Sequence, residues 1–199
     1  MTTPYKLDPI WAGCTVAVLG GGPSMSQAVA DHVRAQGHKC IALNHTLAVA
    51  PWADMLVALD PGPTFCAACD DFPGLRVCGV DDPDTDALYC GPWWETVIIS
   101  PSETISIRNN GLAAIRIAAK LGAAKVLLCG FDPAYRGYHT GKLSALEDAT
   151  LQPFGAGEPY RGLTQGLAAL VDELRAQGIE VEFYSVPVPG RQATADVNE

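Results

Sequence analysis

Charged residues make up only 18% of the 199-residue chain, and thirteen basic residues face twenty-two acidic ones, which gives a net charge of −9. A chain with so few basic residues lacks a broad face for binding nucleic acid, although a local basic groove stays open. No apolar run approaches the length of a membrane-spanning helix, and the amino-terminal residues lack the charged and apolar regions of a signal peptide. We therefore expect a cytosolic protein without a membrane partner.

Several catalytic signatures are also missing from the chain. It has no GxSxG nucleophile elbow, no HExxH helix motif and no paired zinc knuckle. Covalent hydrolases and metalloproteases are therefore poorly supported classes. The GxGxxG spacing of a dinucleotide site and the GxxxxGK[ST] of a P-loop are absent too, so neither chemistry can be assumed.

The seven cysteines are an odd number and do not predict a disulfide framework. Three lie in or beside apolar runs, where a reduced thiol packs as a small apolar group: Cys14, Cys40 and Cys129. The other four are candidate zinc ligands: Cys66, Cys69, Cys78 and Cys90. Cys66 and Cys69 have the spacing of zinc ligands, but the second pair is too far apart for a knuckle. We favour free thiols, with a structural zinc as the alternative.

Apolar strand-like runs alternate with helical stretches along the chain. We expect strands near 15–19, 40–43, 55–59, 75–80, 96–99, 126–129 and 181–184, and helices near 25–36, 112–119 and 163–177. This alternation predicts an α/β, Rossmann-like fold with a mostly parallel sheet and helices on both faces. We expect one domain over 1–199, with a lead-in at 1–14 and a disordered tail at 186–199.

The stretch from Val16 to Ser24 joins a buried strand to a glycine-rich turn and a helix start. Glycines allow close backbone approach, and the first N–H groups of a helix attract anions. Ser24 and Gln27 have capping-box spacing, which places the helix start near Ser24. The turn thus predicts a phosphate site, formed by Gly20, Gly21, Gly22, Pro23 and Ser24. The alternative is a tight turn that binds nothing.

Polar side chains follow several of the expected strands or begin the next helix. They are Asn44, Asp60, Asn109, Asn110 and Asp132. Because the carboxyl ends of parallel strands share one edge, these residues are expected to line one crevice. Amide side chains can bind ribose or base edges, and carboxylates can bind hydroxyls or a divalent metal. Each residue also has a local explanation, because Asn110 can cap a helix and Asn44 can form a turn.

The long polar loop expected over 133–159 carries His139 beside two tyrosines, Tyr135 and Tyr138. The ordinary pKa of histidine, about 6.5, allows the side chain to act as a general base that takes a proton from an acceptor hydroxyl. The tyrosine hydroxyls could stabilise charge on a departing phosphate. A surface loop histidine without a catalytic role is the alternative.

Four motifs in this order resemble a known superfamily: 19–24 (LGGGPS), 44 with 50–54 (APWAD) and Asp60, 110–114 (NGLAA), and 130–132 (GFD). This superfamily includes MptE-like 6-hydroxymethylpterin diphosphokinases, phage-encoded relatives and bacterial sialyltransferases. The resemblance covers most of 15–185 but leaves 61–94 unmatched. It implies a nucleotide pocket built from the glycine turn, Asn44, Asn109, Asn110 and Gly111.

The resemblance also implies a reaction. Sialyltransferases of the group place a general-base histidine after the motif matched by Gly130–Asp132, and His139, Tyr135 and Tyr138 match in order. A glycosyltransferase would use a UDP-, CMP- or GDP-linked sugar, with magnesium not required, and a hydroxymethylated DNA base is one candidate acceptor. The alternatives are a Mg-ATP-dependent diphosphokinase and a non-catalytic nucleotide-binding accessory protein. A phage-encoded chain would act in the host cytoplasm, and a homo-oligomer is a further expectation.

Overall fold

The computed structural model describes residues 8–22, 24–58, 72–78, 95–96, 110–131 and 158–184. Within these ranges, side chains are described except at 78, 95–96 and 158–165. Several candidate site residues lie outside the described residues. They are Pro23, Asp60, Asn109, Asp132, Tyr135, Tyr138 and His139.

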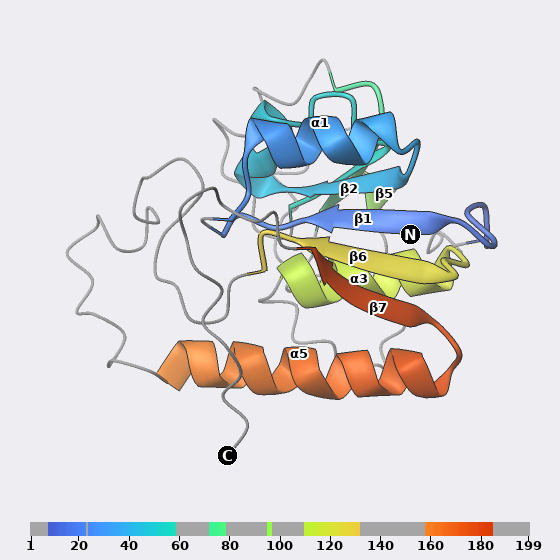
Figure 1. Cartoon of the computed structure of the whole chain (residues 1–199), viewed down its shortest axis with the longest axis vertical. Helices are drawn as coiled ribbons and strands as arrows, with labels where there is room; N and C mark the ends of the chain where they lie inside the picture. Colours follow the sequence, from blue (N-terminus) through green and yellow to red (C-terminus); the bar gives the residue numbers. More distant parts are fainter. Residues whose placement is uncertain are drawn as a thin grey trace.

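Seven parallel strands form one sheet in the order β5-β4-β3-β2-β1-β6-β7 (Figure 1). The strands are β1 (Thr15–Leu19), β2 (Lys39–Leu43), β3 (Met55–Val57), β4 (Leu75–Cys78), β5 (Glu95–Thr96), β6 (Lys125–Cys129) and β7 (Glu180–Tyr184). The helices are α1 (Gln27–Ala35), the short 3-10 helix η1 (Asn44–Ala48), α3 (Asn110–Lys120) and α5 (Glu158–Ala176). The α/β Rossmann-like fold predicted from the sequence is therefore confirmed.

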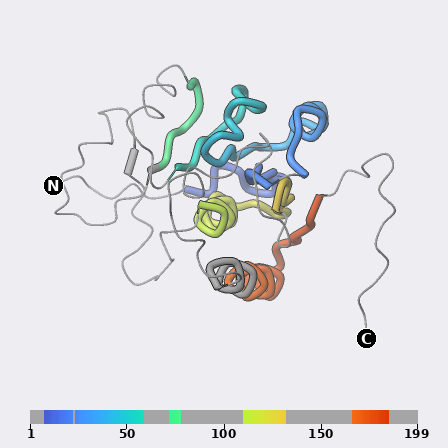
Figure 2. Tube along the Cα trace, turned by 90° about the vertical axis from the view of Figure 1, so that its left-hand side faces the viewer, coloured from blue at the N-terminus to red at the C-terminus, as the bar shows by residue number. Residues whose placement is uncertain are grey.

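Helices cover both faces of the sheet, with α1 on one side and α3 and α5 on the other (Figures 1 and 2). Successive strand side chains point to opposite faces, and β1 shows this alternation clearly. Val16 and Val18 pack with α3 and α5, whereas Ala17 and Leu19 pack with α1. All four are fully buried. Each buried valine or leucine contributes about 1.5–3 kcal/mol to folding.

Two helix starts differ from the prediction. Helix α5 begins at Glu158, ahead of the expected start near 163 and within the end of the expected loop over 133–159. The cap of α1 is the second difference. Ser26, rather than Ser24, caps α1, because its hydroxyl accepts the N–H of Val29 at 3.4 Å. The capping-box spacing of Ser24 and Gln27 was therefore misleading. Gly37, Gly122 and Gly178 follow α1, α3 and α5 in the left-handed conformation that ends helices, with φ of +68°, +91° and +83°.

The amino-terminal segment is fixed to the edge of the sheet where the strands begin. Trp11 is buried, and its backbone N–H donates to the Leu121 carbonyl at 2.8 Å. Gly13 similarly donates to the Gly122 carbonyl at 3.0 Å. Part of the expected lead-in thus belongs to the hydrophobic core, because Trp11 is in the same cluster of buried residues as Leu121 and Ala123, between α3 and β6.

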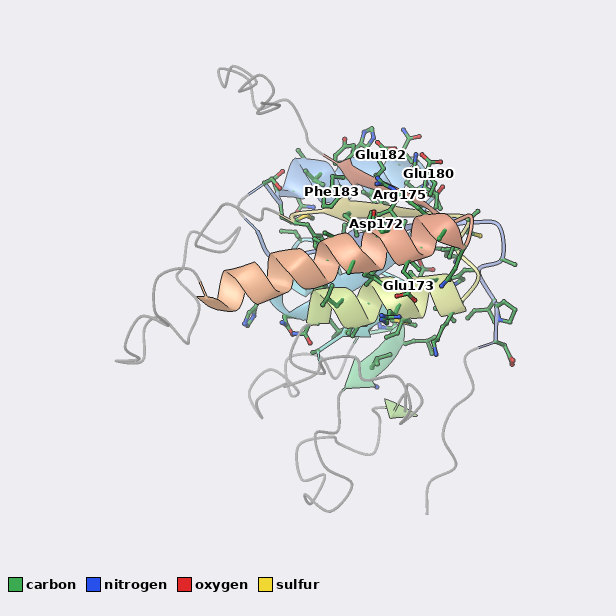
Figure 3. All side chains as sticks on the ribbon, turned by 90° about the horizontal axis from the view of Figure 1, so that it is seen from below. Asp172, Glu173, Arg175, Glu180, Glu182 and Phe183 are labelled. Atoms are coloured by element: carbon green, nitrogen blue, oxygen red, sulfur yellow. The ribbon has the colours of Figure 1, made fainter. Side chains whose placement is uncertain are left out.

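Strand β7 forms one edge of the sheet, where α5 lies beside it (Figure 3). Arg175 of α5 donates to the Val181 carbonyl at 3.1 Å. Lys125 of β6 pairs with Glu180 at 2.8 Å and with Glu182. These contacts tie the edge strand to its helix and to its neighbouring strand, while Phe183 remains 47% exposed.

Within the described residues, Cys14, Cys40 and Cys129 are free thiols, and the latter two are buried as the sequence predicted. No helix in the described ranges is long and apolar enough to cross a membrane. The structure describes the backbone of Cys78 but not its side chain, and the other three candidate zinc ligands lie outside the described residues. The zinc alternative therefore stays a prediction.

Candidate functional site

The strand order places a topological switch point between β1 and β6. From β1 the chain adds β2 to β5 on one side of the sheet, and it then returns to place β6 and β7 on the other side. Open α/β sheets bind ligands in the crevice outside the strand ends at such a point. The glycine turn follows β1 directly, so the strongest ligand signal in the sequence lies at this position.

Strand register brings three segments side by side at the switch point. Leu19, the last residue of β1, lies between Ala42 of β2 and Cys129 of β6. Neighbouring strands are about 4.8 Å apart. The residues that leave the sheet next to one another are therefore the glycine turn from Gly20, Leu43–Asn44 and Gly130–Phe131.

The backbones of Gly20 and Gly130 are in direct contact. The Gly20 N–H donates to the Cys129 carbonyl at 2.7 Å, and the Gly22 N–H donates to the Gly130 carbonyl at 2.9 Å. A Cβ atom on Gly20 would lie 2.7 Å from the Gly130 oxygen, and one on Gly130 would collide with the Gly20 oxygen. Gly130 also has a φ of +69°. Glycine is therefore required at both positions by the close approach of β1 and β6.

These bonds determine which amides of the turn remain for a ligand. The N–H groups of Gly20 and Gly22 are already used, whereas that of Gly21 has no acceptor within the described residues. The turn closes with a bond from the Met25 N–H to the Gly22 carbonyl at 2.9 Å. The glycine turn thus offers fewer free amides than the sequence suggests.

The amino end of α1 adds further donors at the same edge. Ser26 uses the Val29 N–H, and no acidic side chain lies in the first turn to compete for the N–H groups of Gln27 and Ala28. The positive end of the helix dipole stabilises a nearby anion. Gln27 holds this helix end in place by donating to the Val49 carbonyl at 3.1 Å and to Asp31 at 2.9 Å.

Asn44 follows β2 in the left-handed conformation, with a φ of +48°. It is the only described residue other than glycine with a positive φ. Asparagine tolerates this conformation better than most residues, and such backbone strain concentrates at functional sites. The half-buried side chain makes no hydrogen bond within the described residues. Its amide is therefore available to a ligand at the switch point.

Thr46 lies two residues after Asn44 and is the only fully buried polar side chain among the described residues. Its hydroxyl accepts the Leu43 N–H at 2.8 Å and lies 3.0 Å from the Leu19 carbonyl. Thr46 is not among the residues that the sequence motifs predict for the site. The available signal was a threonine within an otherwise apolar stretch, 46–50, which follows a strand.

The Phe131 ring and the Cys129 thiol belong to residues that lie beside the glycine turn. Two ring carbons of Phe131 lie 3.0 Å from the position of a Cβ on Gly20, so this ring packs against Gly20. The Cys129 thiol is buried, and burial, followed by the charge of Glu182, raises its pKa to about 12. A thiol with such a pKa stays protonated at neutral pH and packs instead of acting as a nucleophile.

Asn110 and Gly111 start α3 at the same edge of the sheet (Figure 1). Because α3 ends beside the start of β6, its amino end lies where β6 ends. Gly111 is buried, and Asn110 is half-buried. The structure therefore places the following predicted residues at one edge: Gly20, Gly21, Gly22, Ser24, Asn44, Asn110 and Gly111.

Asp54, in the second of the resembling motifs, lies at the other edge of the sheet. Asp54 precedes β3 and so lies at the edge where strands begin. Its carboxylate accepts the Cys40 N–H at 2.9 Å and pairs with Lys39 at 2.7 Å. Asp54 thus secures the start of β2 and is remote from the switch point.

Searches against protein-family models, curated proteins and solved structures found no match to the chain. The superfamily resemblance therefore stays a prediction from the sequence motifs. Among the described residues, no three or more His, Cys, Asp and Glu side chains are grouped to hold a metal ion. Asp60, Asp132 and His139 fall outside the described residues.

Replacing Gly130 with alanine should destabilise the protein far more than the same change at Gly37. The two residues share the left-handed conformation, with φ of +69° and +68°, but only Gly130 lacks space for a Cβ. We expect G37A to cost about 1–2 kcal/mol and G130A at least about 2 kcal/mol more. Urea unfolding measures both free energies. Equal losses would show that the close contact of the two strands has no energetic weight.

Asn44 allows strain and ligand binding to be separated. Asn44→Gly keeps the left-handed backbone at lower cost, whereas Asn44→Ala retains the strain, so N44A should be about 1 kcal/mol less stable than N44G. Both variants lack the amide and should lose the same nucleotide affinity. Denaturant melts and binding titrations measure the two quantities. If N44A lost more nucleotide affinity than N44G, in proportion to its lower stability, a direct contact between the Asn44 amide and the nucleotide would be contradicted.

Proposed function

We propose that this protein is a nucleotide-binding transferase, in which the phosphate and sugar of a nucleotide lie across the carboxyl ends of β1, β2 and β6. The observation that carries this proposal is the glycine turn at the topological switch point. The N–H of Gly21, which has no acceptor in the described part of the chain, and the first turn of α1 supply donors for a phosphate. Next to them, Asn44 supplies a side-chain amide that makes no hydrogen bond to any residue that the structure describes.

Within that class, we propose glycosyl transfer from a nucleotide-linked sugar to an acceptor hydroxyl. His139 takes the proton of the acceptor hydroxyl while its oxygen forms a bond to the anomeric carbon of the sugar. The bond from that carbon to the phosphate oxygen breaks, and the nucleotide leaves with the electron pair. Amides at the glycine turn, with Tyr135 and Tyr138, stabilise the charge on the departing phosphate.

This choice is supported by the order of residues along the chain. The segment with Asp132, Tyr135, Tyr138 and His139 begins directly after Phe131, which leaves the sheet beside the glycine turn. Phe131 thus lies beside the proposed phosphate position, and the residues proposed for catalysis follow it in the sequence. The acceptor is a hydroxyl compound, with a hydroxymethylated DNA base as one candidate, and the proposed compartment is the cytoplasm.

A thermal-shift panel tests the proposal. CMP, UDP, GDP, ADP and ATP are each added with magnesium and with a chelator, because a ligand that binds only the native state raises the Tm. At about 100-fold excess over Kd, the gain is about 2.7 kcal/mol. We expect stabilisation by CMP, UDP or GDP that survives the chelator. Stabilisation by ATP that needs magnesium would favour diphosphokinase chemistry, and the absence of any shift would contradict nucleotide binding.

Substitution of His139 with alanine separates catalysis from binding. H139A should lose about 100-fold or more of kcat because the general base is missing, while its nucleotide Kd stays near the wild-type value. Product formation by mass spectrometry and calorimetric titration measure the two effects. His38→Ala is the matched control, because His38 follows α1 at the opposite edge of the sheet. Unchanged turnover in H139A would assign the base elsewhere, and a protein that binds nucleotide without any turnover would be a binding module.

A further inference from the structure

We propose that Thr46 is a positioning residue of the nucleotide site, which fixes the glycine turn and Asn44 relative to each other. This inference rests on the proposed function. Thr46 makes no contact with the solvent, since its exposed fraction is 0%. A buried hydroxyl acts on a ligand only through the groups that it bonds.

The Thr46 hydroxyl joins the ends of the two strands that carry the site. It accepts the Leu43 N–H at 2.8 Å, and its single hydrogen is within reach of the Leu19 carbonyl at 3.0 Å and the Leu43 carbonyl at 2.9 Å. Leu19 is the last residue before the glycine turn, and Leu43 is the last before Asn44. One side chain therefore contacts the backbone immediately before both ligand-binding segments.

The bonds of Thr46 also hold Asn44 in its strained conformation. Leu43 and Thr46 flank Asn44 and His45 across the first turn of η1, and their hydrogen bond closes that turn. Asn44 adopts a φ of +48° within it. Without the hydroxyl, the turn could relax and carry the Asn44 amide away from the glycine turn. The Leu43 N–H would also lose its buried acceptor.

Valine has the shape of threonine without its hydroxyl, so Thr46→Val removes the three hydrogen-bond contacts without creating a cavity. Thr46→Ser keeps the hydroxyl and removes only a methyl group. Val126→Ala is the matched control for stability, because Val126 is fully buried near the start of β6, away from the site. If T46V does not fold, Thr46→Ala replaces it in the same comparison.

The experiment has two readouts. Calorimetric titration with whichever of CMP, UDP, GDP, ADP and ATP stabilises the wild type most gives Kd. Amide hydrogen exchange at Gly20, Gly22 and Asn44, measured by NMR without nucleotide, reports the geometry of the turn. We expect T46V to weaken binding about tenfold or more and to accelerate exchange at the glycines. T46S should rescue both, and V126A should change neither despite a lower Tm.

The outcomes separate this inference from the proposed function. If T46V binds within about threefold of the wild type and exchange is unchanged, Thr46 is not a positioning residue. Equal weakening in V126A would reduce its role to general stability and would overturn the inference. If the wild type binds none of the five nucleotides, the proposed function fails. Hydrogen exchange then still decides whether Thr46 fixes the turn.

Discussion

The contact between the backbones of Gly20 and Gly130 is the constraint on which the rest of the site depends. Two strands far apart in the sequence end side by side, and neither tolerates a side chain at the point of contact. The hydrogen bond from Gly22 to the Gly130 carbonyl continues the pairing of β1 and β6 beyond the sheet. The turn is consequently shaped by β6 as much as by its own three glycines.

Much of the fold could be predicted from the sequence because its signals are local. Apolar runs identified β1, β2 and β6, and glycines correctly marked the ends of the helices. The alternation of strands with helices implied a parallel sheet, and parallel strands place their carboxyl ends at one edge. This rule alone, without the strand order, predicted that the glycine turn and Asn44 lie close together.

Other features depend on contacts between distant residues, so the sequence could not reveal them. Ser24 and Ser26 are both suitable caps, and only the path of the turn selects Ser26. The sequence predicts an anion site from all three glycines at 20–22, but the carbonyls of Cys129 and Gly130 accept the N–H groups of Gly20 and Gly22. Thr46 bonds to Leu19, 27 residues earlier in the chain, and no spacing rule links these positions.

The edge strand β7 is protected against pairing with another chain. An exposed strand edge is a template on which another chain can pair, and natural proteins block it with charge and with occupied backbone groups. Arg175 occupies the carbonyl of Val181, and Glu180 and Glu182 share the single positive charge of Lys125. Two copies that approach through β7 therefore bring like charges together and find an acceptor already taken. The carboxy-terminal αβ unit thus ends the sheet with an edge strand whose outer carbonyl is occupied and whose side chains carry charge.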